Sequence, residues 1–219
     1  MKKIIVIAAA GKGSRLGAGK PKCLIEVCGR AIFEYQLKAF GWADEIRMVV
    51  GYQAEEVMRR VSEIDPRVKF VINDEFDSTT TLQSNYLGGD GIKEKVLYID
   101  GDMIISKETS KKLFSMYEKD EKFIGVATDI SEEPVYVEVR EGMANWFDYN
   151  REVDYEWANV AVLQPYDLEY LPTHFFVQIQ KLLPLKAVEI ERLEVDTMED
   201  FSHAEKTILN YPEKYNYWL

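Results

Sequence analysis

The chain has 219 residues, 47% of them hydrophobic, and a formal net charge of −11 at pH 7. This composition is typical of a folded globular protein and argues against a disordered chain, and no run of about eighteen apolar residues marks a membrane-spanning helix. The acidic balance disfavours nucleic acid and anionic membranes as partners, because both need a basic surface. The length predicts one domain over residues 1–219, and the absence of a signal-peptide pattern predicts a cytoplasmic protein.

Strands and helices are expected to alternate through the first 128 residues, because short apolar runs are followed by amphipathic stretches. Such alternation predicts an α/β fold with three αβα layers, in which helices cover both faces of a mostly parallel, Rossmann-like sheet. The predicted strands are 2–8, 23–27, 44–50, 68–72, 95–99 and 123–128, and the predicted helices are 31–41, 53–62, 79–87 and 107–119, the third closed by Gly88 and Gly89.

The pattern changes after residue 130. Residues 135–139 and 157–163 alternate apolar and polar side chains, which is typical of antiparallel strands, so residues 130–190 are predicted to form a small antiparallel β-rich insertion. A helix over 173–183, short strands over 186–190 and 193–195, and a last helix over 199–209, opened by Thr197, complete the prediction.

A glycine-rich, basic segment follows the first predicted strand. Its small residues let the backbone approach a ligand closely, and no acid lies among its cations, which are Lys12, Arg15, Lys20 and Lys22. The combination favours a bound polyphosphate. An ordinary glycine-rich turn between a strand and a helix is the alternative.

Two common phosphate-binding motifs do not fit this segment. A Walker A loop needs Ser or Thr after its Gly-Lys pair, and here Pro21 follows Gly19-Lys20. A dinucleotide-binding loop needs a glycine where this chain has Leu16. The pattern G-x-G-[ST]-R followed by K-P-K, together with residues 22–37, instead resembles the nucleotidyltransferase superfamily, which includes sugar-phosphate nucleotidyltransferases and MobA-like NTP transferases.

This resemblance implies the nucleotide-diphospho-sugar transferase fold and a set of site residues in the opening loop. Arg15 and Lys22 are the expected catalytic residues, with Arg15 on the β- and γ-phosphates and Lys22 between the α-phosphate and the acceptor. The residues expected to bind the nucleotide are Ala9, Ala10, Gly11, Lys12, Gly13, Ser14 and Arg15.

Two acidic segments are candidates for a metal site. Asp100 and Asp102 follow a predicted strand, and Asp196 precedes the last predicted helix. Mg²⁺ in proteins typically takes one or two carboxylates together with phosphate oxygens and water. The resemblance implies that Asp102 and Asp196 bind Mg²⁺, the expected cofactor, and that Asp100 supports these ligands without binding the ion. Without the resemblance, Asp196-Thr197 is interpreted as a helix N-cap.

Residues 73–76 and 79–87 resemble a segment of bacterial CTP:phosphocholine cytidylyltransferase-like enzymes. The resemblance implies that Thr81 and Ser84 lie near the base and ribose of the nucleotide. The chain departs from that segment at Thr80-Thr81, where asparagines are usual, and hydroxyls that cap a helix are the alternative.

Aromatic and acidic residues are mixed in the predicted insertion. Tyr136, Trp146, Glu156 and Trp157 are the candidates for binding the acceptor. Aromatic rings with nearby acids suit a cationic amine. Stacking on a sugar, or packing of the insertion's own core, are the alternatives.

These residues together predict an Mg²⁺-dependent nucleotidyltransferase. Its expected partners are a nucleoside triphosphate, with CTP preferred, and a small phosphorylated or phosphonate acceptor that resembles phosphocholine; a homodimer is also expected. No protein nucleophile is needed, because the acceptor phosphate is already ionised at neutral pH. The alternatives are a sugar-1-phosphate nucleotidyltransferase that uses UTP, GTP or dTTP, and a non-catalytic nucleotide-binding subunit.

Overall fold

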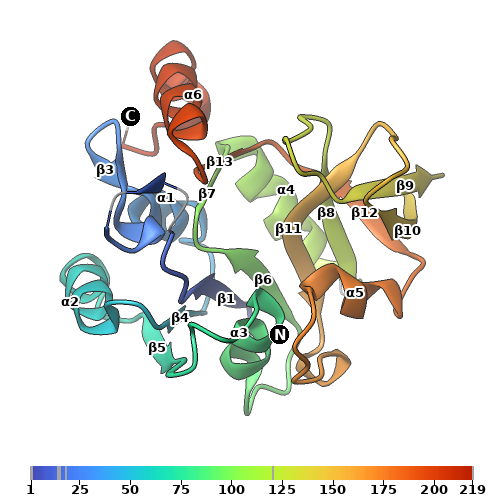
Figure 1. The fold of residues 1–219 in the computed structure, drawn as a ribbon, viewed down its shortest axis with the longest axis horizontal. Helices are drawn as coiled ribbons and strands as arrows, with labels where there is room; N and C mark the ends of the chain where they lie inside the picture. The colour runs from blue at the N-terminus through green and yellow to red at the C-terminus, as the bar shows by residue number, and fades with distance from the viewer. Residues whose placement is uncertain (1, 14–15, 18, 120, 219) are drawn as a thin grey trace.

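The computed structural model describes residues 2–13, 16–17, 19–119 and 121–218. Its centre is a nine-stranded sheet with the strand order β5-β4-β1-β6-β11-β8-β12-β10-β9 (Figure 1). The first four strands in this order run parallel to one another. They are β5 (Lys69–Ile72), β4 (Glu45–Val50), β1 (Ile4–Ala9) and β6 (Val96–Asp100).

The other half of the sheet is mixed. Strand β11 runs antiparallel to both β6 and β8, and a pairing between Glu156 and Tyr136 also joins it to β9. Strands β11, β8, β12, β10 and β9 therefore form a closed circuit of pairings. Their bounds are β8 (Phe123–Ala127), β9 (Tyr136–Arg140), β10 (Met143–Asp148), β11 (Glu156–Leu163) and β12 (Leu185–Glu189).

Helices cover both faces of the sheet, because side chains alternate between the two faces along each strand. In β1, Ile5 and Ile7 enter one core cluster, and Ile4 and Val6 enter the other. The first cluster includes residues of α1 (Ile32–Ala39), α2 (Ala54–Ile64) and α4 (Lys107–Glu118), and the second includes residues of α3 (Thr81–Gly89) and α5 (Phe175–Gln180). The predicted three-layer α/β fold is confirmed, with a sheet that is mixed where β11 enters it.

A small hairpin stands where a single strand was predicted over residues 23–27, and that prediction is right only for residues 26–27. The chain forms a 3₁₀ turn, η2 (Lys22–Leu24), and then pairs β2 (Glu26–Val27) with β3 (Arg30–Ala31). The two residues between these strands, Cys28 and Gly29, have positive φ angles of 50° and 75°. Tight hairpin turns favour such angles, which fold the chain back before a longer strand can form.

Helix α3 continues through Gly88 and Gly89, which were expected to end it. A Cβ atom at Gly88 would meet the side chains of Val6 and Val49. The glycine is therefore needed for close packing of the helix on the sheet.

The remaining elements lie outside the nine-stranded sheet. Strand β10 was not predicted, and α5 is shorter than the helix expected over 173–183. Among the residues that the structure describes, no helix is long and apolar enough to cross a membrane. The other elements are β7 (Met103–Ile105), η3 (Pro165–Asp167), β13 (Arg192–Glu194), α6 (Met198–Asn210) and α7 (Pro212–Tyr215).

Candidate active site

A cavity of about 250 Å³ opens where the carboxyl ends of β1 and β6 meet. It lies at the edge of the sheet where parallel strands form their ligand sites. The structure thus brings the predicted phosphate loop, base segment and acidic turn together. The lining residues are Ala8, Ala9, Gly11, Gly13, Lys22, Cys23, Thr81, Asp100, Gly101 and Asp102.

The Lys22 ammonium lies between two carboxylates that are distant in the sequence. Its Nζ is 2.8 Å from Asp102 Oδ2 and also contacts Asp196 Oδ1. The three side chains are only 15–19% exposed, so water screens their attraction weakly. The structure therefore places Lys22, Asp102 and Asp196 in one group. The predicted roles, with Lys22 at the α-phosphate and the two carboxylates at one metal ion, need these side chains to be close together.

The acidic residues have the chemistry that a divalent cation needs. The Oδ1 atoms of Asp100 and Asp102 are buried, and neither has a hydrogen-bond partner among the described residues. Burial, with the nearby charges of Asp102 and Glu194, raises the pKa of Asp100 well above its usual value. In the described part of the chain, no three His, Cys, Asp or Glu residues gather as a metal site. Two carboxylates suffice for Mg²⁺ when phosphate oxygens and water complete its shell.

The turn that carries Asp102 is held by backbone hydrogen bonds on two sides. The Gly101 N–H donates to Ala8 O at 2.8 Å, and the Val195 N–H donates to Asp102 O at 3.0 Å. A Cβ atom at Gly101 would lie 2.7 Å from Ala9 Cβ, so this close path beside β1 requires glycine.

Thr197, and not Asp196, caps helix α6. The Thr197 Oγ1 accepts from the Asp200 N–H at 3.2 Å, and Asp200 Oδ2 accepts from the Thr197 N–H at 2.8 Å. This reciprocal capping box leaves the Asp196 carboxylate to contact Lys22. Asp200 Oδ2 also accepts from the Asp196 N–H at 3.2 Å, which ties the predicted ligand to the cap.

The glycine-rich loop lies against the stem of Lys22. Gly13 has φ = 63°, and a Cβ atom there would lie 2.5 Å from Lys22 Cγ. Lys12 pairs with Asp77 at 2.6 Å, and the Ala10 carbonyl accepts from the Tyr52 N–H at 3.0 Å. The predicted roles of Ser14 and Arg15 lie outside the described residues.

The predicted base-binding residues have different surroundings. Thr81 is exposed and lines the cavity. Ser84 is buried, and its Oγ accepts from the amide of the buried Asn73 at 3.1 Å. Asn73 also donates to Thr79 Oγ1 at 2.8 Å, so it joins the loop before α3 to the helix. The geometry favours Thr81 for direct contact with a ligand and Ser84 for holding this segment in place.

The four acceptor candidates do not line the cavity, and their role stays a prediction. Glu156 is 1% exposed, and Arg192 donates to it. Trp157 packs edge-on against aromatic rings in the core. Trp146 carries the Arg151 guanidinium 4.9 Å from its ring centre, and Tyr136 pairs with Glu156 across β9 and β11.

Two residues near the site, Cys23 and Asn159, were not among the predicted site residues. Cys23 lines the cavity, but burial raises the pKa of its thiol to about 12, so it is not a reactive thiolate. Asn159 has φ = 52° where the pairing of β11 with β8 is irregular, and it directly precedes Val160, which pairs with Ile99 next to Asp100. The polar side chain of Asn159 between Ala158 and Val160 is the sequence signal that marks it.

The family of the chain is shown by comparison with known proteins. The model of the MobA-like NTP transferase domain matches residues 5–165, which is most of the chain. The chain belongs to this family. The predicted recognition of the superfamily and the predicted nucleotidyltransferase class are thereby confirmed.

Curated relatives of this NTP transferase domain include bifunctional proteins named GlmU. The chain is 32% identical to GlmU of Campylobacter jejuni over 111 residues, which are 50% of this chain and 26% of the relative. It is 31% identical to GlmU of Streptomyces avermitilis over 130 residues, which are 57% of this chain and 27% of that protein. The chain therefore aligns with about a quarter of the length of these relatives.

Solved structures confirm the predicted fold of the NTP transferase domain. The inositol-1-phosphate CTP transferase from T. maritima has a TM-score of 0.78 at 16% identity, covering 94% of this chain and 96% of that chain. The CTP:phosphocholine cytidylyltransferase LicC from Streptococcus pneumoniae has a TM-score of 0.80 at 17% identity, covering 95% and 100%. A UDP-glucose pyrophosphorylase has a TM-score of 0.77 at 13% identity, covering 96% and 99%.

Proposed function

We propose that this NTP transferase domain is an Mg²⁺-dependent enzyme that transfers a nucleoside monophosphate, CMP from CTP, to a small phosphorylated acceptor and releases pyrophosphate. The observation that carries the proposal is the meeting of Lys22 with Asp102 and Asp196 beside a glycine-rich cavity. A binding-only subunit does not need a lysine and two carboxylates at one point. Their convergence favours catalysis.

The residues of the chain divide the work of such a transfer. The glycine-rich loop leaves room for the triphosphate, and Thr81 offers a hydroxyl to the nucleoside. Lys22 places a positive charge where negative charge develops on the α-phosphate, and an oxygen of the ionised acceptor phosphate attacks that phosphorus in line. Asp102 and Asp196 would hold Mg²⁺, which neutralises phosphate charge. Catalysis then rests on positioning and on charge stabilisation.

Two of the similar solved structures are named as CTP-using transferases, and this supports CTP as the donor. The acceptor is proposed to contact residues 130–190, where Tyr136, Trp146, Glu156 and Trp157 lie. The second candidate function is a sugar-1-phosphate nucleotidyltransferase that uses UTP, GTP or dTTP. It is favoured by the similarity to GlmU over half of this chain and by the fold shared with a UDP-glucose pyrophosphorylase.

A matrix of triphosphates and acceptors tests these functions. The purified protein is incubated with Mg²⁺, with CTP, UTP, GTP, dTTP or ATP, and with phosphocholine, inositol-1-phosphate or hexose-1-phosphates, and pyrophosphate release is measured. Release with CTP and a small non-sugar phosphate supports the first proposal, and release with UTP, GTP or dTTP and a sugar phosphate supports the second. Tight nucleotide binding without release from any pair would indicate a binding-only subunit.

Replacement of Asp102 tests the proposed metal site. Asp102→Asn removes one of the two carboxylates, so we expect pyrophosphate release to fall at least about a hundredfold while the far-UV circular dichroism is unchanged. Asp129→Asn removes an exposed carboxylate that does not line the cavity and should keep its activity. Full activity of Asp102→Asn would remove Asp102 from the proposed role.

The single domain over residues 1–219, the cytoplasmic location and the homodimer stay predictions from the sequence. Size-exclusion chromatography with light scattering would test the homodimer.

A further inference from the structure

A glutamine inside the fold contacts the acidic turn from behind. Gln36 lies on α1 with 0% of its surface exposed. Its Nε2 donates to the carbonyl oxygen of Asp100 at 2.7 Å. Gln36 does not line the cavity, so any effect on the reaction must pass through the backbone of this turn.

A glutamine at position 36 stabilises the folded state less than an apolar side chain of similar shape would. Its Oε1 atom is buried and has no hydrogen-bond partner among the described residues. A buried polar atom without a partner destabilises the folded state, and an apolar side chain of similar shape avoids that penalty. Methionine has nearly the same length and would fill the space. The presence of glutamine therefore points to the bond that its Nε2 makes.

That bond completes the support of the turn. The Asp100 carbonyl accepts from Gln36, the Gly101 N–H donates to Ala8 O, and the Asp102 carbonyl accepts from the Val195 N–H. Each residue of the turn 100–102 thus makes one of these hydrogen bonds through its own backbone. The partners of these bonds come from α1, β1 and the segment after β13. Val195 directly precedes Asp196, so the same framework sets the separation of the two carboxylates.

We propose that Gln36 is a positioning residue: its hydrogen bond to the Asp100 carbonyl holds the turn that keeps the Asp102 carboxylate beside Asp196, where the two carboxylates would bind a divalent cation. This inference rests on the proposed function, because it assigns a role toward the proposed metal site. Groups that orient metal ligands commonly change metal affinity or activity 10- to 100-fold when they are replaced.

The chain contains a matched control for this residue. Gln178 on α5 is 3% exposed, its Nε2 donates to the Asp167 carbonyl at 3.3 Å, and its Oε1 is buried without a partner among the described residues. It does not line the cavity. Gln36→Met and Gln178→Met therefore remove the same kind of bond at two different places. Gln36→Leu serves as a second variant if Gln36→Met does not fold.

Three measurements are made on the wild type and on both variants. They are the binding of Mn²⁺ alone by electron paramagnetic resonance, the exchange rate of the Gly101 amide by NMR, and kcat and KM for pyrophosphate release. We expect Gln36→Met to weaken Mn²⁺ binding and lower kcat at least about tenfold, and to speed Gly101 exchange at a similar melting temperature. Gln178→Met should match the wild type in all three.

The outcomes separate the positioning role from the proposed function. If Gln36→Met equals Gln178→Met in Mn²⁺ binding and in Gly101 exchange, the positioning role is overturned even when the wild type is active. If no triphosphate and acceptor pair releases pyrophosphate but Gln36→Met alone weakens Mn²⁺ binding, the proposed function fails and the positioning role stands.

Discussion

At the scale of single residues, the loop and the lysine of the site depend on one glycine. Gly13 adopts a left-handed backbone angle and leaves no room for a Cβ atom beside the stem of Lys22. The two residues therefore form one unit, although eight residues separate them in the sequence. A side chain at position 13 would displace Lys22 from the two carboxylates.

Gly13→Ala tests this unit, and Gly91→Ala is its control. Gly91 has φ = 71°, similar to the 63° of Gly13, but an added Cβ atom would have no described heavy atom within 4 Å. Both changes should cost about 1–2 kcal/mol of stability through the backbone angle. We expect only Gly13→Ala to weaken CTP binding about tenfold or more, measured by titration calorimetry. Equal CTP affinity in the two variants would contradict the coupling of Gly13 to Lys22.

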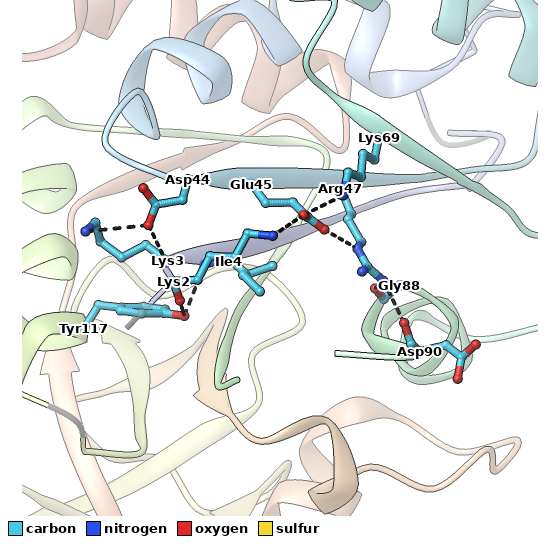
Figure 2. A network of polar contacts seen from close by, with 10 residues as sticks. All are labelled: Lys2, Lys3, Ile4, Asp44, Glu45, Arg47, Lys69, Gly88, Asp90 and Tyr117. Atoms are coloured by element: carbon cyan, nitrogen blue, oxygen red, sulfur yellow. Dashed lines mark hydrogen bonds and ion pairs between the residues drawn. The ribbon is translucent and has the colours of Figure 1, made fainter. Parts of the chain in front are cut away.

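At the scale of elements, an ionic network holds the amino ends of three parallel strands and the end of α3 (Figure 2). Glu45, at the start of β4, accepts from Lys2 before β1, from Lys69 at the start of β5, and from Arg47. Arg47 also donates to the Asp90 carbonyl after α3 at 2.7 Å. The network lies at the edge of the sheet opposite the cavity, so it stabilises the framework without entering the site.

The pH dependence of stability should report this network. Burial by itself raises the pKa of Glu45, but the hydrogen bonds from Lys2, Lys69 and Arg47 lower it to about 2. Because the folded-state pKa lies below the ordinary value of 4.5, the stabilisation is present above pH 4.5 and is lost as the pH falls toward 2. A pKa lowered from 4.5 to about 2 corresponds to a full contribution of about 3 kcal/mol.

Urea unfolding of the wild type and of Glu45→Gln at pH 7 and pH 3 measures this contribution. We expect the free energy of unfolding of the wild type to exceed that of Glu45→Gln at pH 7, and this difference to be clearly smaller at pH 3. Glu56→Gln, which changes an exposed carboxylate paired with Arg59, is the control and should show a much smaller loss, because water screens an exposed pair. A difference in the free energy of unfolding that is the same at both pH values would show that Glu45 acts through packing alone.

At the scale of the whole molecule, a buried ion pair joins the insertion to the hydrogen-bonded strand pair of β7 and β13. Arg192 at the start of β13 is 2.5 Å from Glu156 at the start of β11, and their side chains are 5% and 1% exposed. Glu156 also accepts from the Ser131 N–H and hydroxyl at 3.0 and 2.8 Å. Burial and the nearby Asp102 raise the pKa of Glu194 to about 7, and Arg192 opposes that increase. The Glu156–Arg192 ion pair thus connects the start of β11 in the insertion to β13.

Glu156→Gln distinguishes this structural role from the predicted acceptor role. Removal of one partner from a buried pair leaves the other charge uncompensated, so we expect a loss of about 3–5 kcal/mol in the free energy of unfolding. Glu138→Gln, whose partner Arg140 is 70% exposed, should lose less than about 1 kcal/mol. Unchanged stability of Glu156→Gln together with a raised KM for the acceptor would support the acceptor role instead.

Local patterns in the sequence predicted most elements of the first 128 residues well. The alternation of apolar strands and amphipathic helices up to residue 128 corresponds to β1, β4, β5, β6 and β8 with α1 to α4. In the insertion, β10 was missed because its sequence, MANWFD, lacks a clear apolar alternation. The hairpin at residues 26–31 was missed because positive φ angles at Cys28 and Gly29 are a property of the folded turn.

The sequence by itself determined the family, the order of the main elements and the acidic and glycine-rich segments of the site, because each depends on neighbouring residues. Only the tertiary structure decided that Lys22 lies between Asp102 and Asp196 and that Glu156 is buried beside Arg192. These contacts join residues far apart in the chain, and the order and direction of the strands select them. Gln36 belongs to the same class, because its amide matters only when the turn after β6 passes beside α1.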